Sequence, residues 1–281
     1  MKKIFKLQPI YKDAVWGEST LSEELGISNR RISEIWSFIN TDEQSLCDGE
    51  IPISKIVSRE FFPLVIKILN AAKDLSVQVH PQKNEAWYIL SAKEGATLSL
   101  GFKNENFDIE NMGTPTRQIL DELVTYHPKP GEIYYIPQGA VHYLGGGIRA
   151  LEVQTDLLTT YRIYDHDRLE NGKPRQLHIN EAKECINPKE KGIIRSALAT
   201  EDKKLYTLLI THYFTIKKLT IAQGDFIFPA DNENFCLICT KGSGKIENYN
   251  ISKYDTVFTK HEPTVEISQA ENLELILVYA F

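Results

Sequence analysis

The sequence lacks the features that mark several large classes of protein. Its 281 residues include only four cysteines, no excess of basic over acidic residues, and no apolar run near the ~20 residues of a transmembrane helix. The formal net charge of −6 disfavours binding to nucleic acid or to a membrane surface, because both need a basic footprint. We therefore expect neither partner, although a compact basic pocket for one phosphate can exist inside an acidic protein.

The few cysteines also exclude a disulfide-rich fold and a zinc ribbon. They are Cys47, Cys185, Cys236 and Cys239. Cys236 and Cys239 have a C-x-x-C spacing, but they lie in a strand-like apolar run, where residues three apart face opposite sides and cannot share a metal. We expect buried, reduced thiols. Pro9 interrupts any signal-peptide core, so the sequence is typical of a cytoplasmic protein.

Short alternating segments dominate the chain and predict a mainly β protein. Strands are expected at 34–39, 75–79, 96–102, 131–136, 148–155 and 161–165, and eight more between 204 and 279. Short helical insertions are expected at 20–27, 106–124 and 179–186, while 60–74 fits a helix or a buried strand, with Val and Ile favouring the strand. Short strands spaced by about 8–12 residues are typical of a barrel or sandwich. We predict two jelly-roll barrels.

A change in composition places the predicted domain boundary. Residues 166–200 are polar and contain Pro and Gly, in contrast to the strands on either side. The expected division is therefore a first barrel with a polar site over 1–175, a linker with a short helix over 176–204, and a second barrel over 205–281.

Leu75–Val79 alternates polar and apolar residues up to His80, and it is the segment with the most unusual polar face. Successive strand side chains point to opposite faces, so Ser76, Gln78 and His80 share one face. A hydroxyl, an amide and an imidazole in line are unusual for a core and ordinary for a site. Pro81 ends the strand, because it has no N–H to donate.

Two further residues turn this face into a candidate metal site. Glu85 follows His80 after one tight turn, and His142 follows a later strand and turn. Two imidazoles and a carboxylate, with an open position, have the composition of a catalytic zinc site, and the same mixture binds iron, manganese or nickel. Histidines on strands are often merely structural, so the residues alone leave both interpretations open.

Several motifs in order resemble class I mannose-6-phosphate isomerases of the short bacterial and archaeal type. The resemblance covers roughly residues 8–180 and rests on Val15-Trp16-Gly17, Glu34-Ile35-Trp36, Leu75–Pro81, Lys83–Leu90, Gly131–Pro137 with Gly139 and His142, Leu151-Glu152, and Thr160–Asp165. It implies cupin-type barrels and a zinc-dependent enzyme that interconverts mannose 6-phosphate and fructose 6-phosphate through a cis-enediol.

The resemblance also implies roles for individual residues. One Zn²⁺, or another divalent metal, would be held by Gln78, His80, Glu85 and His142; substrate would be bound by Ser76, Lys83 and Trp16; and catalysis would involve Arg162, Glu152 and Lys83. Arg162 would stabilise the enediolate, and Glu152 or Lys83 would be the general base. A structural ion pair between Glu152 and Arg162, and a core or rim position for Trp16, remain alternatives.

One departure from the family keeps other functions open. Only Gln82 separates Pro81 from Lys83, where the family usually has a longer loop. A shorter loop implies a more open cleft and allows a different sugar phosphate. The alternatives are a non-catalytic cupin that binds a sugar phosphate and an iron-dependent oxygenase. The expected partner is a small sugar phosphate, and a monomer and a homodimer fit the sequence equally well.

Overall fold

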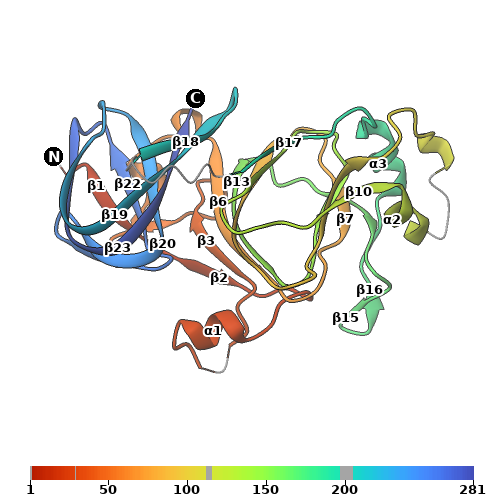
Figure 1. Ribbon diagram of the computed structural model, residues 1–281, viewed down its shortest axis with the longest axis horizontal. Helices are drawn as coiled ribbons and strands as arrows, with labels where there is room; N and C mark the ends of the chain where they lie inside the picture. The colour runs from red at the N-terminus through yellow and green to blue at the C-terminus, as the bar shows by residue number, and fades with distance from the viewer. Residues whose placement is uncertain (1, 29, 112–115, 197–204) are drawn as a thin grey trace. The chain divides into compact units, whose positions relative to one another are not determined.

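The computed structural model describes residues 2–28, 30–111, 116–196 and 205–281, and the chain is mainly β, as predicted (Figure 1). It divides into two compact units. Unit 1 contains residues 1–11, 35–68 and 197–281, and unit 2 contains residues 12–34 and 69–196. No helix among the described residues is long and apolar enough to cross a membrane.

Unit 1 is built on an antiparallel sheet with the strand order β18-β19-β23-β20-β22-β1-β4-β5, and β21 pairs with β20. The strands are β1 (Ile4–Gln8), β4 (Leu46–Cys47), β5 (Ile51–Pro52), β18 (Leu205–Ile210), β19 (Phe214–Pro229), β20 (Asn234–Ile246), β21 (Tyr249–Ser252), β22 (Thr256–Lys260) and β23 (Thr264–Ala280), with 3₁₀ turns η1 (Ile53–Lys55) and η2 (Arg59–Phe61). Leu237, Leu275 and Leu277 are among the residues of its apolar core.

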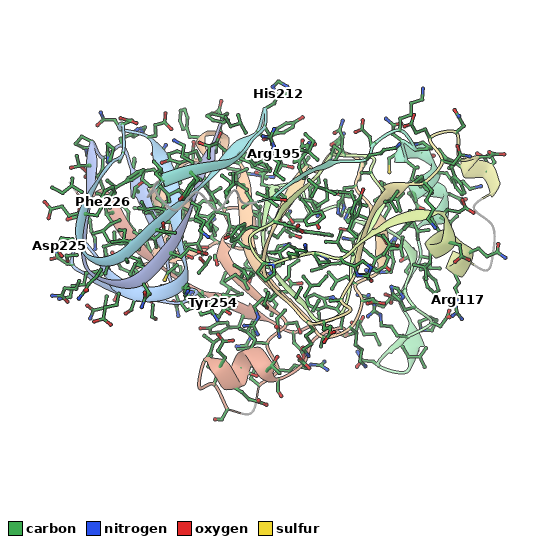
Figure 2. The ribbon with its side chains drawn as sticks, in the orientation of Figure 1. Arg117, Arg195, His212, Asp225, Phe226 and Tyr254 are labelled. Atoms are coloured by element: carbon green, nitrogen blue, oxygen red, sulfur yellow. The ribbon has the colours of Figure 1, made fainter. Side chains whose placement is uncertain are left out.

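The long strands of unit 1 contain segments that the sequence predicts as separate short strands. The pairing of β19 with β23 continues from Phe214 to Pro229 through a register shift between Gly224 and Phe226. Asp225 lies at this bulge beside Phe226 (Figure 2), and its carboxylate accepts a hydrogen bond from the backbone N–H of Gln269. A bulge bends a strand without ending it, so a local turn signal there does not mark a strand end.

Unit 2 contains two groups of strands that pack on a shared core. One is the sheet β10-β9-β12-β7-β14, and the other has the order β17-β11-β8-β13. The strands are β7 (Val77–Val79), β8 (Glu85–Ala92), β9 (Leu98–Phe102), β10 (Leu123–Tyr126), β11 (Ile133–Ile136), β12 (His142–Leu144), β13 (Ile148–Thr155), β14 (Tyr161–Tyr164) and β17 (Ile193–Arg195), and the two-stranded hairpin is β15 (Leu169–Glu170) with β16 (Lys173–Pro174).

Short helices accompany these strands. They are α1 (Thr20–Glu24), η3 (Ile109–Asn111), η4 (Thr116–Gln118), α2 (Ile119–Glu122) and α3 (Ile179–Cys185). Val77 and Val79 pack in a buried cluster with Ile163 and with Ala182 of α3. The apolar face of β7 is thus covered by helix, which leaves its polar face for the interior of unit 2.

The predicted domain boundaries are wrong in two respects. First, β1 pairs with β22 from Ile4 to Leu7, so the N-terminal strand belongs to unit 1 and not to the first barrel. Second, residues 176–196 are part of unit 2 and not a linker, because β17 pairs with β11 and α3 packs on β14. The rest of the predicted linker, 197–204, lies outside the described residues.

Other local expectations are confirmed or refined. The ambiguous segment 60–74 contains strand β6 (Leu64–Ala71), and β3 (Glu34–Phe38) and α1 lie where expected; β2 (Ile10–Lys12) was not predicted. The predicted helix over 106–124 is present only as the short helices η3, η4 and α2, with 112–115 outside the described residues, and it gives way to strand β10 at Leu123. Cys236 and Cys239 are both buried in β20, as predicted.

Candidate metal centre

The five-stranded sheet brings three of the predicted site residues side by side. Gln78 on β7 lies opposite His142 on β12 and opposite Arg162 on β14. Residues directly opposite each other in an antiparallel pair point to the same face of the sheet. The alternation of β7, with Val77 and Val79 packed on the other face, therefore places Gln78 between an imidazole and a guanidinium.

A second strand pair presents another polar row. On β8 and β13, Glu85 lies opposite Gln154, and Trp87 lies opposite Glu152. All four side chains are buried, and the Trp87 indole N–H donates to the Glu152 carboxylate at 3.0 Å. The Trp87 and His142 rings meet edge to face, with centroids 5.5 Å apart, so this row adjoins the first sheet.

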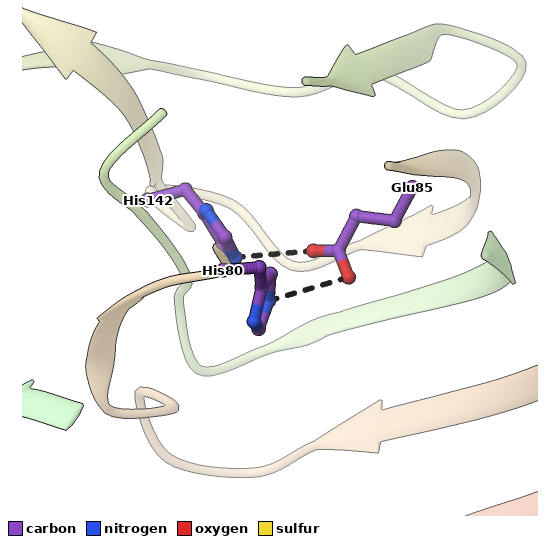
Figure 3. Close-up of side chains that lie close together, drawn as sticks. All are labelled: His80, Glu85 and His142. Atoms are coloured by element: carbon purple, nitrogen blue, oxygen red, sulfur yellow. Dashed lines mark ion pairs between the residues drawn. The ribbon is translucent and has the colours of Figure 1, made fainter. Parts of the chain in front are cut away.

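His80, Glu85 and His142 converge into one buried group (Figure 3). The Nε2 atom of His142 lies 3.1 Å from Glu85 Oε1, and that of His80 lies 3.5 Å from Glu85 Oε2. The side chains are at most 1% exposed. Ligands bound at about 2.0–2.1 Å in a tetrahedron lie roughly 3.3–3.4 Å apart, so these spacings fit a metal such as zinc.

Each imidazole is oriented by a backbone carbonyl. The Nδ1 atom of His80 lies 2.9 Å from the carbonyl oxygen of Thr159, and that of His142 lies 2.9 Å from the carbonyl oxygen of Ala140. A carbonyl oxygen only accepts hydrogen bonds, so each Nδ1 carries the proton and each Nε2 is directed at Glu85. This is the arrangement that metal-binding histidines commonly have.

Three buried atoms of this group make no hydrogen bond within the described part of the chain, although one of them, Glu85 Oε2, lies in an ion pair 2.7 Å from the Lys83 ammonium. They are His80 Nε2 and both carboxylate oxygens of Glu85. A neutral imidazole would direct its Nε2 lone pair at a carboxylate oxygen, which is unfavourable. A cation between the two atoms would turn this repulsion into two bonds, so the donor set fits a divalent metal.

The charges around Glu85 favour its ionised form. Burial alone would raise the pKa of Glu85, but Lys83, His80 and His142 lower this pKa well below its usual value. Burial, and next the Lys83 ammonium, lower the pKa of His80 to about 3, so His80 is neutral near pH 7. An ionised carboxylate and a neutral imidazole are the forms that bind metals.

Gln78 adjoins the group, with its amide Nε2 3.3 Å from His142 Nε2. Its Oε1 accepts a hydrogen bond from the Ser76 hydroxyl at 3.4 Å. Metal ligation requires the amide oxygen on the side of His142, which a half-turn of the amide provides. Because a hydroxyl both donates and accepts, Ser76 suits either orientation. Ser76, predicted to bind substrate, therefore directly contacts Gln78.

Lys83 is buried in the centre, although a lysine in a tight turn is usually solvated. Its Nζ lies 2.7 Å from Glu85 Oε2 and 3.4 Å from Gln154 Oε1. The next residue fixes this turn: Asn84 Oδ1 accepts hydrogen bonds from the Tyr135 hydroxyl and from the backbone N–H of Gln138. The turn therefore directs Lys83 inward.

The remaining predicted residues differ in their surroundings. Glu152 contacts Trp87, as described above. Arg162 donates from Nη1 to the carbonyl oxygen of Gln176, and burial followed by the nearby Arg175 lowers the pKa of its guanidinium. Trp16 is 5% exposed and packs in the core cluster with Trp87 and Leu100, so its surroundings are those of a core aromatic.

Sequence reasoning missed two groups of residues. Gln154 lies two positions after Glu152 on an alternating strand, and this spacing was the available signal. Asp165, which ends the Tyr161–Asp165 motif, accepts hydrogen bonds from Arg168 and Arg175. This buried carboxylate cross-links the segment after β14, and such pairing over ten residues has no local sequence signature.

The loop after β11 packs against the backbone of His80. Gly139 has a positive φ of 80°, its N–H donates to the carbonyl oxygen of His80, and an added Cβ would lie 2.9 Å from the carbonyl oxygen of Cys185. A cavity of about 420 Å³ adjoins this loop and Pro81. Among the described residues that line it are carboxylates but no lysine or arginine, so it is unsuited to a phosphate.

Comparison with known proteins identifies relatives over most of the chain. The family model described as "Phosphomannose isomerase type I, catalytic domain" matches residues 39–106. Mannose-6-phosphate isomerase ManA of Bacillus subtilis is 32% identical over 250 residues, covering 76% of this chain and 78% of the relative. The mannose-6-phosphate isomerase of Streptococcus mutans is 30% identical over 254 residues, covering 77% and 78%.

Solved structures agree with this result. The mannose 6-phosphate isomerase structure from Bacillus subtilis superposes with a TM-score of 0.85 at 26% identity, covering 99% of this chain and 100% of the other. A putative mannosephosphate isomerase from Archaeoglobus fulgidus shares the fold, with a TM-score of 0.75 at 17% identity and coverage of 99% and 97%. The predicted cupin-type fold is confirmed, and the chain belongs to the type I mannose-6-phosphate isomerase family.

Proposed function

We propose that this protein is a metal-dependent aldose–ketose isomerase that interconverts mannose 6-phosphate and fructose 6-phosphate. The observation that carries the proposal is the buried group of His80, Glu85 and His142, with spacings that suit one metal ion, in a chain of this family. We assign zinc as the metal, because imidazole and carboxylate ligands suit it, and Gln78 as the fourth ligand.

The metal would act as a Lewis acid toward the sugar oxygens. The chain itself must then move a proton between C1 and C2 and stabilise the charge of the cis-enediol form. Arg162, opposite Gln78 in the sheet, would stabilise a negatively charged sugar oxygen. Its guanidinium also offers the paired donors that an oxyanion or phosphate accepts.

The contacts support Glu152 over Lys83 as the general base. Lys83 is an ammonium paired with Glu85, and in this form it has no lone pair with which to take a proton. Glu152 is a buried carboxylate oriented by the indole N–H of Trp87. We therefore assign the proton transfer to Glu152 and an electrostatic role to Lys83.

A coupled assay of fructose 6-phosphate formation from mannose 6-phosphate tests the proposal. We expect turnover by the wild type, loss of turnover with a chelator, and loss in His142→Ala, because this variant lacks a metal ligand. His127→Ala is the matched control, since His127 is exposed and lies outside the group. Absence of turnover from a folded, zinc-loaded wild type would refute this activity and favour a binding protein; oxygen consumption with bound iron would favour an oxygenase.

A further inference from the structure

Lys83 occupies an unusual position for a lysine beside a candidate metal ligand. Its side chain is 6% exposed, and its Nζ lies 2.7 Å from Oε2 of the fully buried Glu85. The same carboxylate belongs to the group that fits a metal. Glu85 therefore has two prospective cationic partners, the ammonium and a metal ion, within one enclosed space.

The Lys83 ammonium and a divalent metal would compete for the negative charge of Glu85. One ammonium lies against one carboxylate, so the two charges offset each other. A divalent cation on Glu85 would lie within a few ångströms of that ammonium, in surroundings that screen charge poorly. Metal binding should therefore move Lys83 away from Oε2.

Gln154 supplies a second acceptor for the displaced ammonium. Its Oε1 lies 3.4 Å from Lys83 Nζ, and Gln154 stands opposite Glu85 across the β8–β13 pair. Its Nε2 donates to the carbonyl oxygens of Thr155 and Leu157, which fixes the amide with its oxygen toward Lys83. The side chain is fully buried, so this orientation is built into the strand.

We propose that Lys83 is an internal counter-ion for Glu85 that a divalent metal displaces, and that Gln154 is the positioning residue that retains the displaced ammonium in the site. The inference rests on the metal centre of the proposed function. It adds that the Lys83 ammonium balances the charge of Glu85 when no metal is bound. Metal affinity is then limited by competition between the metal and this lysine for Glu85.

Direct metal titration of the purified protein tests this without reference to turnover. The probes are Co²⁺, followed by its visible absorption, and Zn²⁺, followed by competition with a chelating dye. Removal of the competing charge in Lys83→Met should tighten binding by at least about tenfold. Lys83→Arg, which keeps the charge, should remain within a few-fold of the wild type, and melting curves should show that each variant is folded.

A double-mutant cycle tests the part assigned to Gln154. Gln154→Met removes the second acceptor, so it should weaken metal binding by about tenfold while Lys83 is present. It should have little effect in the Lys83→Met background, where no ammonium needs the acceptor. General damage from loss of the amide would weaken binding equally in both backgrounds, and that result would overturn the role of Gln154.

The outcomes separate this inference from the proposed function. Tighter metal binding by Lys83→Met supports the counter-ion role even if mannose 6-phosphate is not turned over. Equal or weaker binding by Lys83→Met, or no metal binding by the wild type, overturns the counter-ion role even if the isomerase assay succeeds.

Discussion

Asp165 offers a stability prediction that follows directly from its contacts. The carboxylate is 6% exposed and accepts four hydrogen bonds from Arg168 and Arg175, whose side chains are 14% and 16% exposed. Asp165→Asn removes the charge and leaves two guanidinium groups facing each other beside Arg162. Removing one partner of a fully buried ion pair costs roughly 3–5 kcal/mol. Since these arginines keep some solvent contact, we expect about 2–3 kcal/mol.

The assay is urea unfolding of metal-free protein in a Trp36→Phe background. Of the three tryptophans, only Trp36 lies in unit 1, so the remaining fluorescence reports unit 2. The matched control is Glu110→Gln, which removes an ion pair to Lys183 from an 81% exposed carboxylate and should cost less than about 0.5 kcal/mol.

The effect of Asp165 should also depend on pH. Burial raises the pKa of Asp165, but the hydrogen bonds from Arg175 and Arg168 lower it by more. The net pKa therefore lies below the ordinary value of 3.8. A lowered folded-state pKa contributes stability above 3.8 that is lost as the pH falls through the folded value. The wild type and Asp165→Asn should converge below 3.8. A loss equal to that of Glu110→Gln at neutral pH would refute the reasoning.

Three further predictions follow from the site. Gly139→Ala should destabilise unit 2 by about 1–3 kcal/mol in the same urea assay, and Gly95→Ala should cost less. Both glycines have a positive φ, but a Cβ would lie within 3 Å of backbone atoms only at Gly139. An equal loss of unfolding free energy in the two variants would contradict a steric clash at Gly139. Glu152→Gln should lower kcat by roughly 10²–10⁴ with unchanged zinc content, and near-normal turnover would exclude Glu152 as the base. Zinc at 100 times its Kd should stabilise the metal-free protein by about 2.7 kcal/mol in urea, but not His142→Ala.

The sequence predicts the polar row of the site because local alternation determines it. Val77 and Val79 pack under α3, while Gln78 and His80 take the opposite face, as period two requires. The convergence of Glu85 and His142 with His80 follows from strand pairing, and here the family resemblance anticipated what periodicity could not.

Other features depend on long-range contacts and have no local signal. The pairing of β1 with β22 joins residues about 250 positions apart, so no composition shift reveals that the N-terminal strand belongs to unit 1. The sequence predicts that Lys83, in a tight turn, is exposed to solvent. The hydrogen bonds that Asn84 accepts from Tyr135 and Gln138 instead fix the turn so that the Lys83 side chain points inward. Bulges such as that at Gly224 resemble strand ends because both use residues that favour turns.

Stepwise reconstitution of the metal-free protein with zinc is the most direct test of the central claim. Mannose 6-phosphate isomerisation should rise in proportion to added zinc and level off at one zinc per chain. His142→Ala should remain inactive throughout. Full turnover by protein that holds no metal, or none by folded protein that holds one zinc at His80, Glu85 and His142, would contradict the account.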